Sequence, residues 1–128
     1  MTTKVYLPPT PEGVSWWAVF IEVVECKDLT TKFFDDPEIG GAFMIVCTTA
    51  ASTDDAERKV INEVIKEGGM IVDREDLYEI LSPDDLPLHS DESVADEGLL
   101  NVFSDPDFKG DIVWGSAYCY PPGEELVQ

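Results

Sequence analysis

The segment AFMIVCTTAASTDDAERKVINEVIKEGGMIVDREDLYEIL, residues 42–81, decides the fold of this chain. Near its start, Phe43 to Cys47 is an unbroken apolar run, which is typical of a strand buried on both faces. A second apolar run, Met70 to Val72, opens its last part. The segment therefore predicts a strand, a helix and another strand.

The middle of this segment predicts one helix over residues 53–67. Ser52 or Thr53 can cap its first turn with a side-chain oxygen, and Gly68 is typical of a helix end. The apolar positions recur with a period near 3.6 and form one stripe: Ala56, Val60, Ile61, Val64 and Ile65. We expect this stripe to pack on one face of a sheet that contains residues 43–48 and 111–120.

The complete pattern predicts an α+β fold. Residues 16–26 read as a first long strand and residues 111–120 as the last. The result is a two-layer sandwich with a mixed or antiparallel sheet of about four strands and one main helix on one face. It is related to the split strand-helix-strand plan of ferredoxin-like folds, with its topology left open. We expect one domain, residues 1–128, with a flexible lead-in (1–13) and tail (121–128).

The last predicted strand alternates between large and small side chains. Ile112, Trp114, Tyr118 and Tyr120 fall on one face, and the small residues fall on the other, where a helix layer can lie close. Two interpretations of the large face remain. Lead-in and loop residues such as Phe33 cover it, or Trp114 and Tyr118 form an aromatic platform for a partner or for a second copy in a homodimer.

Charge is the outstanding feature of the composition. The chain has 8 Lys and Arg against 27 Asp and Glu, a net charge of −19. No Lys or Arg lies between Arg74 and Lys109, which enclose these carboxylates: Glu75, Asp76, Glu79, Asp84, Asp85, Asp91, Glu92, Asp96, Glu97, Asp105 and Asp107. Such a stretch repels nucleic acid and anionic membrane and attracts a basic protein. The residues that we expect to contact this partner are Asp84, Asp85, Asp91, Glu92, Asp96, Glu97, Trp114 and Tyr118.

The cysteines and the termini indicate the environment of the protein. Cys26, Cys47 and Cys119 lie in or beside predicted strands, and their odd number and spacing argue against disulfide or zinc frameworks. We expect buried, reduced thiols. No apolar run has transmembrane length, and residues 1–13 lack the apolar core of a signal peptide, so a cytoplasmic location is expected.

Motifs for chemistry are weak. His89 has serine and aspartate neighbours, but adjacent loop residues do not arrange a catalytic triad merely by proximity in sequence. Asp105 and Asp107 resemble the start of a calcium loop, yet Lys109 and Ser116 occupy positions where ligands belong. Adjacent acid pairs could hold magnesium only weakly. We therefore expect no catalytic residue, no cofactor and no metal site.

These observations predict a non-enzymatic acidic protein that docks and neutralises a basic protein. The class that fits best is an immunity or inhibitor protein of a toxin such as a nuclease, because opposite potentials speed encounter and select the partner. One alternative is a nucleic-acid mimic that inhibits a DNA- or RNA-binding protein. Others are a small enzyme or metabolic domain with an unrecognised cleft, and a domain whose acidity serves only solubility.

Overall fold

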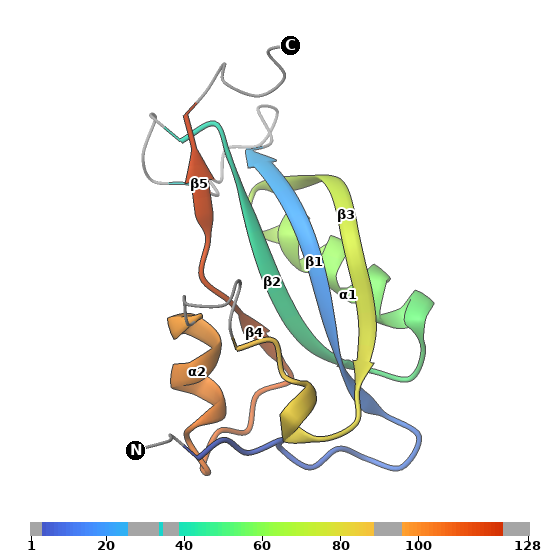
Figure 1. Ribbon diagram of the computed structural model, residues 1–128. Coiled ribbons are helices and arrows are strands. Elements are labelled where there is room, and N and C mark those ends of the chain that lie inside the picture. Colours follow the sequence, from blue (N-terminus) through green and yellow to red (C-terminus); the bar gives the residue numbers. More distant parts are fainter. Residues whose placement is uncertain (1–3, 26–33, 35–38, 89–95, 122–128) are drawn as a thin grey trace.

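The computed structural model describes residues 4–25, 34, 39–88 and 96–121 (Figure 1). The elements in chain order are β1 (Ser15–Glu25), β2 (Gly41–Ala50), α1 (Thr53–Lys66), β3 (Gly69–Ile80), the 3-10 turn η1 (Pro83–Asp85), α2 (Glu97–Phe103), β4 (Ile112–Trp114) and β5 (Tyr118–Tyr120). None of the helices within these residues is long and apolar enough to cross a membrane. The predicted α+β class is confirmed.

The sheet has five strands and is antiparallel at every pairing. The strand order is β3-β1-β2-β4. The short strand β5 pairs with the same edge of β2 as β4 does, but with the first residues of β2. Because β1 is antiparallel to both β2 and β3, those two strands run parallel to each other on either side of it. Helix α1 connects them. The chain therefore contains the strand-helix-strand unit that residues 42–81 predict, and β1 lies between its two strands.

Helix α1 begins with reciprocal capping. The backbone N–H of Asp55 donates to Ser52 Oγ at 3.2 Å, and Asp55 Oδ2 accepts from the N–H of Ala51 at 3.2 Å. The bond from Ala51, helped by the Arg58 guanidinium at 2.6 Å, holds the pKa of Asp55 below its usual range. The helix ends just before Gly68, whose φ of 98° suits a residue without a side chain. Ser52, one of the two predicted caps, is thus the one used.

The packing of α1 differs from the prediction in one respect. Ala56, Val60 and Val64 are buried against the sheet, whereas Ile61 is 39% exposed and Ile65 is 50% exposed. The prediction that Ile61 and Ile65 pack on the sheet is wrong. Every fourth residue faces the sheet, and the next position along is rotated by about 100° around the helix axis. That rotation carries both isoleucines toward solvent beside the edge strand β3.

The opposite face of the sheet is also covered over part of its area. Figure 1 shows α1 behind the sheet and α2 on the other side, near β4. The buried residues on the α2 side are Trp16, Ala18, Ile45, Cys47, Ile80, Leu86, Leu99, Phe103 and Val113. Residues of the lead-in also contribute to this cluster. Val5 and Leu7 pack against it, and the N–H of Tyr6 donates to Phe103 O at 2.7 Å. The sheet therefore lies between two apolar clusters, not one.

The predicted last strand is divided into β4 and β5 by a one-residue shift in register. Trp114 pairs with Val46, while Tyr118 pairs with Phe43, so two residues of β2 stand opposite three residues, 115–117. An extra residue of this kind inverts the alternation of side chains between the two faces. The N–H of Gly115 still donates to Ile45 O at 2.8 Å, which keeps the bulge attached to β2.

This inversion overturns the predicted aromatic face. Ile112 and Trp114 pack with the cluster on the α1 side, whereas Tyr118 lies beside Phe43 and Ile45 on the other side. The prediction that Ile112, Trp114, Tyr118 and Tyr120 share one face is therefore wrong. Trp114 and Tyr118 do not form one platform. Phe33, the other candidate cover, lies outside the described residues.

The cysteines fall into different environments. Cys47 is completely buried in β2, and burial raises the pKa of its thiol to about 12, which leaves it protonated and inert. Cys119 is exposed, so the prediction of a buried thiol is wrong there. It belongs to a three-residue strand at the edge of the sheet, where little packs on it. Cys26 lies outside the described residues.

Candidate functional site

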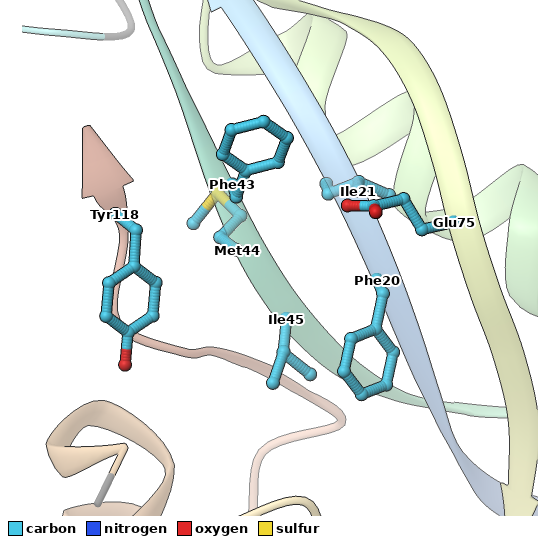
Figure 2. Close-up of a pocket in the computed structure, with 7 residues that line it drawn as sticks. All are labelled: Phe20, Ile21, Phe43, Met44, Ile45, Glu75 and Tyr118. Carbon is cyan, nitrogen blue, oxygen red and sulfur yellow. The ribbon is translucent and has the colours of Figure 1, made fainter. Parts of the chain in front are cut away.

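A pocket of about 310 Å³ opens on the face of the sheet opposite α1 (Figure 2). Its lining residues are Phe20, Ile21, Phe43, Met44, Ile45, Glu75 and Tyr118. They come from four strands, β1, β2, β3 and β5. Phe43 is 42% exposed and Tyr118 is 40% exposed, so large aromatic surfaces face solvent here. Exposed apolar surface gathered in a hollow is typical of a binding site.

The strand register brings the aromatic and acidic side chains of this pocket together. Phe43 stands directly opposite Tyr118 across β2 and β5, and opposite Glu22 across β1 and β2. Phe20 stands opposite Ile45 on the same face. Cross-strand partners point to one side of a sheet and lie close enough to interact. Each of these residues is therefore positioned by backbone hydrogen bonding, not by a loop.

Tyr120 fixes one end of this face. Its hydroxyl donates to Glu22 Oε2 at 2.5 Å, and its ring lies 5.7 Å from that of Phe43, measured between centroids. To reach Glu22 the side chain crosses Gly41, where a Cβ atom would overlap the tyrosine hydroxyl. Glycine at this position lets Tyr120 hold both Glu22 and Phe43 in place before any ligand arrives.

Glu75 supplies the carboxylate of the pocket through a second bulge. Arg74 pairs with Ile21 and Asp76 with Phe20, so Glu75 is the extra residue between them on β3. A bulge re-aims the side chain that it carries. Glu75 points toward the pocket, while Arg74 pairs with Glu57 of α1 on the other side of the sheet. Among the residues that the structure describes, Glu75 takes part in no salt bridge.

The residues predicted to contact a partner are distributed over several elements. Asp84 and Asp85 are exposed on η1, where Asp85 Oδ2 also accepts from the N–H of Leu81 at 3.0 Å. Glu97 is exposed in the first turn of α2. Asp91 and Glu92 lie outside the described residues. Of the two predicted aromatic residues, Tyr118 lines the pocket and Trp114 is half-buried on the α1 side.

Asp96 has a structural role instead of a surface one. Its side chain is completely buried, and its Oδ1 accepts from the N–H of Leu99 at 3.1 Å and of Ser116 at 2.9 Å. It is the N-cap of α2, and it also holds the bulge between β4 and β5. Oδ2 has no hydrogen-bond partner within the described part of the chain. The prediction that Asp96 contacts a docked partner is wrong, because no surface of it is accessible.

The described cations of α1 and β3 lie among carboxylates in this structure. The Lys and Arg residues of α1 and Arg74 each pair with a carboxylate on the α1 side of the molecule. These pairs are Arg58–Asp55 at 2.6 Å, Lys59–Asp111 at 3.5 Å, Lys66–Glu63 at 3.9 Å, and Arg74–Glu57. Apart from the buried Asp96, all described carboxylates of the segment 75–108 are exposed: Glu75, Asp76, Glu79, Asp84, Asp85, Glu97, Asp105 and Asp107. We call these eight residues the acidic set.

Comparisons with known proteins provide no relative from which to transfer a function. No family model matches the chain, and no curated protein and no solved structure matches it. Within the residues that the structure describes, no group of three or more His, Cys, Asp or Glu side chains gathers in a way that could hold a metal ion. His89 is outside those residues. The aromatic pocket and the acidic set are therefore the features from which a function is argued.

The pocket contains residues that sequence analysis did not select. Sequence analysis places Phe43 in a run that is typical of a strand buried on both faces, and it places Phe20 in the first long strand without a role in a site. The sequence contains one signal for this face. Glu22 lies two residues after Phe20, so both side chains point to the same side of the strand, and a carboxylate inside an apolar strand indicates that this side is open to solvent. The position of Glu75 depends on a bulge, for which the sequence carries no comparable signal.

Proposed function

We propose that this chain is a non-enzymatic acidic binding protein that docks and neutralises a basic protein, as an immunity or inhibitor protein of a toxin does. The observation that carries the proposal is the exposure of the acidic set in a segment that contains no Lys or Arg. The cations of α1 and Arg74 are engaged with carboxylates on the α1 side, while the acidic set is exposed. A partner with a positive surface meets no Lys or Arg in the segment 75–108.

The expected effect of this charge is mainly on recognition. A single exposed ion pair contributes about 0–1 kcal/mol, so no one carboxylate of the acidic set determines affinity. Their summed potential steers a basic protein toward this surface and raises the rate of encounter. It also excludes nucleic acid and anionic membrane as direct ligands. This pattern suits a protein that must reach a harmful basic partner quickly.

Two matched double variants test whether the acidic set is the docking surface. The first, Asp84→Asn with Glu97→Gln, removes two charges from the acidic set. The second, Asp54→Asn with Glu67→Gln, removes the same two groups from exposed positions at the two ends of α1. The net charge is identical in both variants. A difference between them therefore reports the position of the charge and not its total.

The partner is first captured from a lysate of the native organism at low salt and purified. Association rates are then measured by surface plasmon resonance for the wild-type protein and both variants. We expect the acidic-set variant to associate roughly two- to fivefold more slowly, with the α1 variant close to the wild type. Equal slowing of both variants would mean that the acidic set contributes only net charge and is not the docking surface. Failure to capture any basic protein would contradict the proposal directly.

A further inference from the structure

We infer that the pocket between β1, β2, β3 and β5 receives an arginine side chain of the basic partner. The inference rests on the proposed function for the existence of that partner. The chemistry of the pocket is independent of that proposal. It consists of three aromatic rings, one carboxylate that forms no salt bridge within the described residues, and the charge of the surrounding surface.

The aromatic rings provide the first part of the argument. Phe20, Phe43 and Tyr118 line the hollow from three neighbouring strands, and two of these rings are about 40% exposed. A cation over such a ring is attracted by its quadrupole, and arginine also stacks its planar guanidinium on aromatic faces. The guanidinium is more weakly hydrated than the lysine ammonium group, so its burial in this hollow costs less.

The carboxylate of Glu75 provides the second part. It lines the pocket beside the rings, and within the described residues it forms no salt bridge. Carboxylate and guanidinium form short, charge-assisted hydrogen bonds, often two in parallel. An apolar side chain in the pocket would instead take water away from Glu75 without replacing the lost hydrogen bonds. The pocket is therefore better suited to a cation than to an aliphatic group.

The charge of the chain argues against a second copy as the occupant. Each protomer carries a net charge of −19, and the described residues around this pocket include Glu22 and Glu75, with no Lys or Arg among the described lining residues. A symmetric dimer through this face would bring two such groups of carboxylates together, which is repulsive. A basic partner brings the complementary charge.

The test uses the full chain and a small probe, so it does not depend on identifying the partner. The probe is acetyl-Gly-Arg-Gly-amide, and its control is the same peptide with neutral citrulline in place of arginine. Binding is followed at low salt by amide chemical shifts in isotope-labelled protein. We expect saturable shifts at Phe43, Glu75 and Tyr118, with affinity for the citrulline peptide at least about fivefold lower.

Two substitutions locate the site. Glu75→Gln should weaken binding of the arginine peptide roughly three- to tenfold, because it removes the charged acceptor. Glu12→Gln removes the same charge from an exposed turn before β1 and should leave binding unchanged. Equal affinity for both peptides, equal effects of both substitutions, or shifts that avoid the pocket would each overturn the inference. So would concentration-dependent dimerisation with shifts at these same residues.

Failure of this inference can be distinguished from failure of the proposed function. If the acidic-set variant slows association with the partner but the arginine peptide does not bind, the pocket has another role and the docking proposal stands. If the peptide binds the pocket but the two double variants associate with the partner at equal rates, arginine binding by the pocket is supported and docking through the acidic set is contradicted.

Discussion

The carboxylate of Asp96 accepts a hydrogen bond of 2.9 Å from the backbone N–H of Ser116, which ties the acidic segment to the bulge between β4 and β5. This contact spans twenty residues of sequence, and the Asp96 side chain that accepts it is completely buried. It helps to hold the backbone in the register that turns Tyr118 toward the pocket and Trp114 away from it.

Replacement of this carboxylate should destabilise the protein. Asp96→Ala removes the cap of α2 and leaves the N–H groups of Leu99 and Ser116 without their acceptor, so we expect a loss of about 2–4 kcal/mol in the free energy of unfolding. Urea denaturation measures this loss. Glu97→Gln, at the exposed neighbouring position, should change stability by less than about 0.5 kcal/mol. Similar values for both variants would contradict the structural role of Asp96.

The two sides of α1 should respond differently to truncation. Val64 is completely buried, and Val64→Ala should cost about 2 kcal/mol from lost burial and the cavity that remains. Ile61→Ala removes more atoms but from a side chain that is 39% exposed, and should cost less than about 1 kcal/mol. Chemical denaturation of both variants measures these changes in the free energy of unfolding. A larger cost at Ile61 would mean that the helix is rotated relative to its position in this structure.

The elements that sequence could predict are those governed by local pattern. Residues 42–81 carry their own strand runs, capping residue and helical period, and the strand-helix-strand unit was predicted from them. Asp96 also carried a usable signal, since an aspartate three residues before Leu99 at the start of an apolar run is an N-cap pattern. Its many acidic neighbours instead favour its interpretation as part of a charged surface.

The features that sequence could not predict depend on long-range register. The alternation of Ile112, Trp114, Tyr118 and Tyr120 implies one face only if the strand is continuous. One extra residue opposite β2 inverts the side-chain orientation in the second half of this segment, and no local sequence pattern predicts that extra residue. Likewise, Ile61 belongs to the helical stripe, and only the orientation of α1 on the sheet decides that it faces solvent.

Alkaline pH should destabilise the fold. Burial raises the pKa of Cys47 to about 12, and burial with the neighbouring Cys47, Asp76 and Asp85 charges raises that of Tyr78 to about 12. Their ordinary values are 9.0 and 10.0, so the unfolded chain releases these protons first as pH rises. The stabilisation is complete below pH 9.0 and is lost progressively toward about 12.

Denaturation midpoints between pH 8 and 11 measure this loss, and Cys47→Ala provides the comparison. The variant is less stable at every pH because it leaves a cavity, so the slope is compared and not the absolute value. We expect a shallower decline above pH 9.0 in the variant. An unchanged slope would show that the Cys47 thiol does not contribute.

The exposed and buried thiols should differ in their reaction with a thiol reagent. In a Cys26→Ser background, Cys119 should react rapidly in the folded protein because it is exposed. Cys47 should react only after denaturation, since it is buried and protonated. Stoichiometry is measured with Ellman's reagent before and after addition of guanidinium. Two reactive thiols under native conditions would contradict the burial of Cys47 in β2.

The most direct test of the docking account is the salt dependence of association with the captured basic partner. Exposed charges are screened over about 8 Å at physiological ionic strength, so steering by the acidic set must weaken as salt is added. Stopped-flow measurement over a range of salt concentrations separates the two rate constants. We expect the association rate constant to fall by roughly tenfold or more between low and high salt, while dissociation changes much less. An association rate constant that is independent of salt would contradict the account.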